Sequence, residues 1–207
     1  MIATVDAATI LGARGHPVTV EVHIAKGLPG FTMLGLPDES CREARDRVRA
    51  AIMSSGFAWP DKKVTVNLAP PHYRKTGSGL DVAIAVGVLT AAGLIPPDAV
   101  DRLAFAGELG LDGSIRRVPG VAPMVGVRSD HDWVVPAGCV AEARVAGRGT
   151  IRAVGRLDQL VEALTGAGPW PDLDEAPTVF VEPELHDLAD VKGQPMARLA
   201  LEVAAAG

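Results

Sequence analysis

Two residues of one glycine-rich loop could carry out covalent chemistry. Ser78 lies three residues after Lys75 in the segment Arg74-Lys-Thr-Gly-Ser-Gly-Leu-Asp81. A serine hydroxyl attacks a carbonyl when a base takes its proton, and a lysine can be that base when it is desolvated and close to the hydroxyl. Lys75 follows Arg74 in a glycine-rich loop, where we expect its ammonium group to be solvated and charged. A serine–lysine peptidase that uses Ser78 and Lys75 is therefore an alternative rather than the leading hypothesis.

The same loop could instead bind a phosphate group. Gly77-Ser-Gly79 precedes an apolar segment with the character of a helix, and the N–H groups at a helix N-terminus attract phosphate. The complete Gly-x-Gly-x-x-Gly pattern is missing, because Val82 occupies the place of the third glycine. A phosphate-binding module is thus a second alternative, better suited to a DNA backbone than to a nucleotide.

Basic residues indicate a third kind of site, for DNA. Lys62 and Lys63 begin an expected strand, and Arg74 and Lys75 follow its end, so the two pairs would be roughly 20 Å apart at ~3.3 Å per residue. The formal net charge is −5, so any contact with DNA must be a local patch, weak, independent of sequence and sensitive to salt. The competing surface is a helix face formed by Arg42, Arg45 and Arg49.

The composition indicates which elements position these residues. Hydrophobic residues make up 48% of the 207 residues and aromatic residues only 4%, so the core must consist of Val, Ala, Leu and Ile. Such a core suits a helix-covered sheet, which is typical of an α/β protein.

Hydrophobic periodicity places strands and helices in alternation. Strands are expected at residues 18–24, 31–36, 63–68, 103–108, 133–136 and 151–154, and helices at 38–55, 81–92, 140–146, 157–164 and 195–206. Asp38 competes with Ser40 as the N-cap of the first helix. Asp112-Gly113 predicts a two-residue hairpin with a type I′ turn. This order predicts an α/β fold with a mixed sheet and packed helices.

Neither cysteine chemistry nor a membrane span is indicated. Cys41 and Cys139 are too few and too far apart for a disulfide framework or a metal site, and we expect both to be buried. The apolar stretch 82–95 is too short to cross a bilayer, and no signal-peptide pattern is visible. We therefore expect a cytoplasmic protein without a metal site or a membrane partner.

The chain changes character after residue 165. Residues 166–187 are rich in proline, glycine and acidic residues, which predicts an extended linker after a domain formed by residues 1–165. Residues 188–207 then resume an apolar helical pattern. The expected organisation is one domain, one linker and one separate tail.

Two segments resemble the signature segments of the Lon-protease catalytic domain. They are Arg74–Asp81 and Gly107-Glu-Leu-Gly-Leu-Asp-Gly113 with the residues that follow it. The resemblance places Gly79 at the position of the Lon serine and Ala122 at the position of the Lon lysine. Because neither residue can act as a nucleophile or a base, the resemblance implies a Lon-like domain without catalytic residues.

The whole chain resembles the N-terminal part of ComM/YifB-type ATPases, which are magnesium-chelatase-like AAA+ proteins. Four motifs carry the likeness: Gly35-Leu-Pro-Asp-Glu-Ser40, Val66-Asn-Leu-Ala-Pro-Pro71, Lys75–Asp81 and Gly107–Gly113. The resemblance implies the fold of Lon catalytic domains and of the second domain of ribosomal protein S5. It also implies a hexameric ATP-driven motor on branched DNA in recombination and competence.

The tail adds to the same resemblance. Asp190-Val-Lys-Gly-Gln194 and the helix after it are similar to the segment before the Walker A loop of such ATPases, which would place Gly193 and Gln194 near the adenine of ATP. No Gly-x-x-x-x-Gly-Lys-[ST] loop occurs in the 207 residues. We therefore expect no cofactor in this segment, and ATP and Mg in an ATPase module that is missing here.

Overall fold

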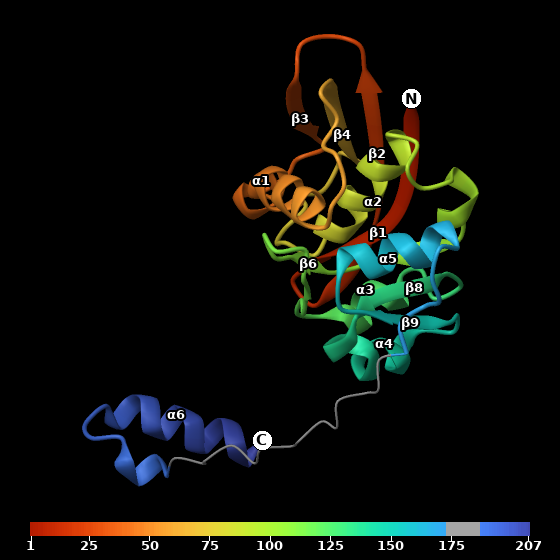
Figure 1. Ribbon diagram of the computed structural model, residues 1–207. Coiled ribbons are helices and arrows are strands. Elements are labelled where there is room, and N and C mark those ends of the chain that lie inside the picture. Colours follow the sequence, from red (N-terminus) through yellow and green to blue (C-terminus); the bar gives the residue numbers. More distant parts are fainter. Residues whose placement is uncertain (173–186) are drawn as a thin grey trace. The chain divides into compact units, whose positions relative to one another are not determined.

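The first 172 residues form a seven-stranded sheet with helices packed on it (Figure 1). The computed structural model describes residues 1–172 and 187–207. The strand order is β3-β4-β2-β1-β5-β8-β9. These strands are β1 (Ile2–Leu11), β2 (Arg14–Ala25), β3 (Gly30–Leu34), β4 (Lys63–Ala69), β5 (Leu103–Phe105), β8 (Asp132–Pro136) and β9 (Ile151–Val154). The helices of this unit are α1 (Glu39–Ser54), α2 (Asp81–Ala91), α3 (Val121–Gly126), α4 (Val140–Ala146) and α5 (Leu157–Thr165).

The sheet is mixed, as the sequence predicts. The pairs β1–β2 and β2–β4 are antiparallel. The pairs β3–β4, β1–β5, β5–β8 and β8–β9 are parallel. The predicted mixed α/β architecture is therefore confirmed.

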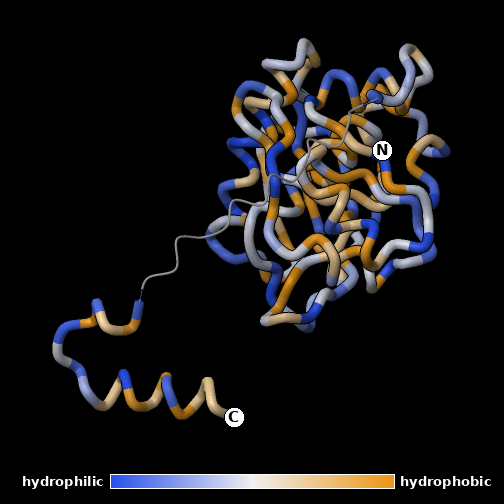
Figure 2. Tube along the Cα trace, turned by 90° about the horizontal axis from the view of Figure 1, so that it is seen from below, coloured by the Kyte–Doolittle hydropathy of each residue, from blue (hydrophilic) through white to orange (hydrophobic). Residues whose placement is uncertain are grey.

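One core layer lies between the sheet and helices α1, α2 and α5. Every residue of α2 is buried, in agreement with the prediction of a helix that is apolar nearly all round. The strands contribute alternate residues to this layer, such as Val18, Val20 and Val22 of β2, while Glu21 and His23 remain exposed. The hydropathy-coloured trace of Figure 2 shows hydrophobic residues gathered inside this unit.

A second, smaller core covers the other face of the sheet around β5 and β8. It joins α3 and α4 to Ala104, Trp133 and Val135. The part of the sheet around β5 and β8 is thus covered on both faces. Strands β2 and β4 instead carry exposed or half-exposed polar residues on one face, such as Glu21 and Asn67.

Strand β1 is an element that the sequence analysis missed. It pairs with β2 over its whole length and ends in a two-residue turn, because Leu11 is opposite Arg14. Gly12 has a φ of 63°, as a turn with glycine at its first central position requires. Glycine followed by one residue between two alternating segments was a usable signal for this hairpin.

The hairpin predicted at Asp112-Gly113 is wrong in its turn type. β6 (Glu108–Leu109) pairs with β7 (Ile115–Arg116), so the loop is longer than two residues. The N–H of Gly113 donates to the carbonyl of Gly110 (3.0 Å), and Gly113 alone has a positive φ of 82°. This geometry fits a type I turn followed by a left-handed glycine, which does not need a positive φ at Asp112.

The tail forms a separate unit with η3 (Leu188–Asp190) and α6 (Pro195–Ala206). Gly193 and Gln194 both have positive φ, 71° and 52°, and Gln194 is the N-cap of α6. Most of the predicted linker, residues 173–186, lies outside the described residues. None of the described helices has the length and apolar character needed to cross a membrane.

Candidate functional site

The two glycine-bearing segments meet at one hollow of about 630 Å³. The loop Thr76–Gly79 lines one part of it, and Val118–Gly120 lines another. A Cβ added to Gly79 would lie 3.3 Å from Cε of Met124, a residue of α3. Because Ala122 belongs to the same short helix, the fold brings together the elements that carry both dyad positions.

The glycine loop is fixed by hydrogen bonds to the N-terminal end of α1. One carboxylate oxygen of Asp38 accepts the N–H of Gly77 at 3.1 Å, and the other accepts the N–H of Cys41 at 2.7 Å. Asp38 is thus the N-cap of α1, which decides the competition with Ser40 in favour of Asp38. The Sγ of Cys41 donates to the carbonyl of Gly77 at 3.1 Å.

Two amide groups of the glycine loop, those of Thr76 and Gly77, donate hydrogen bonds within the protein. Besides Gly77, the N–H of Thr76 donates to Oγ1 of Thr9 at 3.2 Å, and that of Val82 donates to the carbonyl of Gly107 at 3.2 Å. A phosphate cradle needs several N–H groups directed at one anion. Here the carboxylate of Asp38 already accepts the N–H of Gly77, and its negative charge opposes a phosphate at this point of the loop.

Ser78 and Lys75 each have other partners. The hydroxyl of Ser78 donates to Oε2 of Glu108, which ties the two glycine-bearing segments together. Nζ of Lys75 donates to the carbonyls of Pro70 and Tyr73, the latter at 3.0 Å, and lies 4.5 Å from the ring centroid of Tyr73. The geometry therefore does not assemble a Ser78–Lys75 dyad.

The environment of Lys75 differs from the expected one. We expected a solvated ammonium group, but the residue is fully buried, and desolvation lowers the pKa of its side chain. Its carbonyl partners come from the turn that follows β4, which the sequence pattern did not place around it. A buried ammonium with these partners is not open to a DNA phosphate, so the DNA surface proposed below omits Lys75.

A buried ion pair lies behind the glycine loop. Nε of Arg47 is 2.7 Å from Oδ2 of Asp81, and Nη2 is 3.0 Å from Oδ1. The N–H of Leu109 donates to Oδ2 of Asp81 at 3.2 Å. Desolvation raises the pKa of Asp81, and the hydrogen bonds from Arg47 oppose this rise. The pair links α1, α2 and β6, and so fixes the entry of α2 behind the loop.

The sequence matches a known family over more than half of its length. Residues 20–138 match the family model described as subunit ChlI of Mg-chelatase. The chain belongs to the ChlI family. It is 39% identical to YifB of Escherichia coli strain K12 over 210 residues, an alignment that covers 100% of this chain and 41% of that protein.

Further relatives support the resemblance to ComM/YifB-type proteins. The chain is 36% identical over 213 residues to the competence protein ComM of Haemophilus influenzae, covering 100% of this chain and 42% of that protein. It is also 36% identical over 212 residues to YifB of Salmonella typhimurium, with 100% and 41% coverage. The ChlI-family chain thus spans about two fifths of the length of these relatives.

In this ChlI-family chain the predicted basic pairs lie at opposite ends of β4. Lys62 and Lys63 are exposed at its start, and Arg74 is exposed beyond its end. Arg42, Arg45 and Arg49 are all exposed on α1. Among residues 1–172 and 187–207, no group of three or more His, Cys, Asp or Glu side chains is arranged to hold a metal ion.

Proposed function

We propose that the chain is a non-catalytic N-terminal domain of a magnesium-chelatase-like AAA+ ATPase that acts on branched DNA in recombination and competence. Its fold is of the Lon catalytic type, like domain 2 of ribosomal protein S5. The observation that carries this proposal is the meeting of the two signature segments around Gly79 and near Ala122, while Ser78 donates to Glu108 instead of Lys75. The scaffold of a serine–lysine site is thus combined with residues that cannot perform its chemistry.

The domain serves ring assembly, DNA contact or both. The whole protein acts as a cytoplasmic hexamer that uses ATP and Mg, and this domain itself uses neither. Gly193 and Gln194 lie near the adenine of ATP in that assembly. Support for this role comes from the left-handed turn at both residues and from a hollow of about 460 Å³ at the start of α6 that Gly193 lines.

The absence of peptidase chemistry is tested with a fluorophosphonate probe on the 207-residue chain. We expect no labelling of Ser78, since its hydroxyl has a carboxylate partner and no lysine base. Labelling of Ser78 that disappears in Lys75→Ala would refute the non-catalytic assignment. ATP binding is tested separately by calorimetry, and micromolar binding by this chain would show that the nucleotide site is misplaced.

The DNA contact is tested by fluorescence anisotropy with a branched DNA at two salt concentrations. We expect weak binding at low salt that is lost at high salt, because phosphate contacts release counterions. The double variant Lys62→Ala/Lys63→Ala and the single variant Arg74→Ala compare the two ends of β4. If no DNA binds at low salt, the domain serves ring assembly and the DNA part of the proposal fails.

A further inference from the structure

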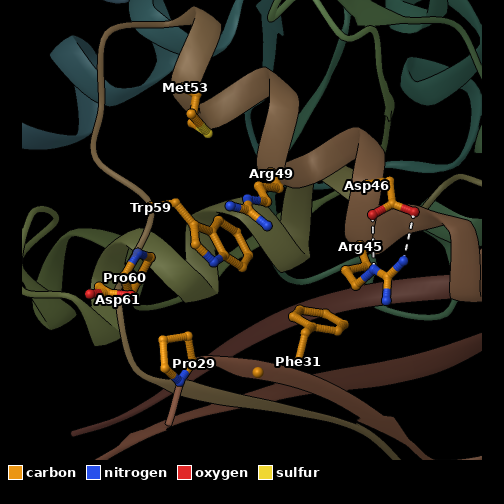
Figure 3. Close-up of a pocket in the computed structure, with 10 residues that line it drawn as sticks. Pro29, Phe31, Arg45, Asp46, Arg49, Met53, Trp59, Pro60 and Asp61 are labelled. Carbon is orange, nitrogen blue, oxygen red and sulfur yellow. Dashed lines mark hydrogen bonds and ion pairs between the residues drawn. The ribbon is translucent and has the colours of Figure 1, made fainter.

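A second hollow, of about 540 Å³, combines aromatic rings with cationic groups (Figure 3). It lies between α1, the start of β3 and the segment that leads from α1 to β4. Phe31, Arg45, Asp46, Arg49, Trp59 and Asp61 are among the residues that line it. None of them takes part in the hydrogen bonds that fix the glycine loop.

Two aromatic side chains form part of the wall. The ring centroids of Phe31 and Trp59 are 6.1 Å apart, and their planes are inclined by 38°. Both side chains are half-buried, because each packs partly against the core. Their packing holds the two rings in place, while their remaining surface faces the hollow (Figure 3). Rings held in this way can stack on a base at little entropic cost.

The charge around the rings is suited to an anionic ligand. A neighbouring hollow of about 530 Å³ shares Trp59, Pro60 and Asp61 with the first and is lined by Lys26 and Lys62. Four cationic side chains (Lys26, Arg45, Arg49, Lys62) and two carboxylates (Asp46, Asp61) therefore line the two hollows. This local excess of positive charge contrasts with the formal net charge of −5 for the chain.

Arg49, unlike Arg45, is available for a ligand. Arg45 is engaged by Asp46, with Nε 2.9 Å from Oδ1. Arg49 is exposed and makes no hydrogen bond or ion pair to any residue in the part of the chain that the structure describes. Its charge still acts on Asp46, whose pKa is lowered first by Arg45 and then by Arg49. Its guanidinium group lies on the same hollow as the Trp59 ring, so one nucleotide could meet both.

We propose that this pair of hollows binds an unpaired segment of a nucleic-acid strand. Trp59 stacks on a base, and Arg49 and Lys62 contact the adjoining phosphates. Bases within a duplex are stacked on each other, so their faces are open to a protein ring only where the strand is unpaired. This inference rests on the proposed DNA function and names the site and the form of DNA that it binds.

The two hollows also bring together residues from two surfaces that the sequence pattern predicted as alternative DNA sites. Lys62 was grouped with Arg74 and Lys75, whereas Arg49 belonged to the separate face of α1. The structure places Lys62 and Arg49 on hollows that share Trp59, and it places Arg74 beyond the other end of β4. The aromatic wall was missed because Phe31 and Trp59 are 28 positions apart in the sequence.

The test uses anisotropy titrations of the 207-residue chain with a labelled thymidine oligonucleotide of about 12 nucleotides, within the usual site size for single strands. An abasic oligonucleotide of equal length and a duplex serve as comparison ligands. We expect the single strand to bind at least about tenfold more tightly than the abasic strand, because stacking requires the base. Equal affinity for the two strands would overturn the stacking role of Trp59.

Two variants and a matched control locate the site. Arg49→Ala should weaken single-strand binding about three- to tenfold and reduce its salt dependence, as expected for one phosphate contact. Trp59→Leu should remove most of the preference over the abasic strand. Arg14→Ala is the control, because Arg14 is exposed on β2 and does not line either hollow. Circular dichroism verifies the fold of each variant, and Arg49→Ala decides the outcome if Trp59→Leu does not fold.

The outcomes separate this inference from the function on which it rests. If the wild type and Arg49→Ala bind branched DNA equally but Arg74→Ala binds it more weakly, binding at the two hollows is overturned, while the proposed DNA function is retained. Equal losses in Arg14→Ala and Arg49→Ala would indicate a non-specific effect of charge and would also overturn binding at the two hollows. Absence of binding to every DNA at low salt would remove both proposals.

Discussion

The guanidinium group of Arg47 holds the carboxylate of Asp81 through two hydrogen bonds, of 2.7 and 3.0 Å. The side chain of Asp81 is 1% exposed to solvent, whereas that of Arg47 is 19% exposed. The carboxylate therefore depends on Arg47 and on the N–H of Leu109 for compensation of its lost hydration. The ion pair thus fixes the start of α2, directly after the glycine loop.

We predict that Arg47→Met destabilises the chain by about 3 kcal/mol at neutral pH, because it leaves a buried carboxylate without its cation. Desolvation then acts on Asp81 with less opposition, so the pKa of this group rises further. A group whose folded pKa is raised stabilises the protein below its unfolded pKa and loses that effect as pH rises. The loss in Arg47→Met should accordingly shrink when urea denaturation is repeated near pH 4, about the unfolded pKa of an aspartate.

Two comparisons check the assignment of this effect to the ion pair. In Arg47→Met/Asp81→Asn the additional pH dependence should vanish, since the ionisable group is gone. Arg42→Met, an exposed substitution on the same helix, should change the free energy of unfolding by less than about 0.5 kcal/mol. An equal loss in Arg42→Met and Arg47→Met would contradict the role of the pair.

Cys41 provides a prediction for alkaline pH. Burial, followed by the negative charge of Asp38, raises the pKa of this thiol to about 12. The folded chain therefore keeps a proton that the unfolded chain loses at its ordinary pKa of about 8.5. Stability from this group is complete below that pH and declines as pH rises toward 12. In Cys41→Ala this decline should be smaller, as measured by denaturation at several alkaline pH values.

The same environment should make the thiol unreactive. Alkylation proceeds through the thiolate, which Cys41 does not form near neutral pH in the folded state. We expect iodoacetamide to modify Cys41 only after denaturant is added. If mass spectrometry shows rapid modification of Cys41 in the folded chain, the thiol is not buried and its pKa is not raised.

Gly15 tests the contact between β2 and α3. A Cβ added at this position would lie 1.9 Å from the carbonyl oxygen of Pro123, so Gly15→Ala must push the helix and the strand apart. We predict a loss of about 2 kcal/mol or more, as in other overpacked interiors. Gly30→Ala is the control, because its nearest added contact is 4.0 Å away, and its stability should stay close to that of the wild type. Thermal denaturation of the two variants gives the comparison.

Periodicity predicted most of the elements because each buries one face or all of its surface. α2 is buried throughout, and β2 alternates, so their patterns are unambiguous. β1 was missed because its inward residues include the small side chains of Ala3 and Ala7, which give a weak hydrophobic signal. Its place in the sheet also depends on pairing with β5, which is distant in sequence.

The residues of a candidate site could be predicted from the sequence only where a local motif identifies them. The resemblance assigns Gly79 and Ala122 to the two dyad positions because both lie in recognisable motifs, and in the fold the glycine loop lies against the helix that contains Ala122. The burial of Lys75 depends on carbonyls of Pro70 and Tyr73, whose direction is a property of the folded turn. Arg47 differs from Arg45 and Arg49 only in helical position, and its partner Asp81 is 34 residues away.

The tail provides the last prediction. α6 has no buried residue among Pro195–Ala206, and Met196, Leu199, Leu201 and Val203 are exposed. A helix of this length is marginal in water without tertiary packing. We therefore expect amides of α6 to exchange with solvent far faster than those of α2, whose exchange should require unfolding of the core. Hydrogen exchange followed by mass spectrometry of the monomeric chain measures both helices together. Equal protection of α6 and α2 in the monomer would show that the tail is packed, and would contradict its proposed role as the start of an ATPase module.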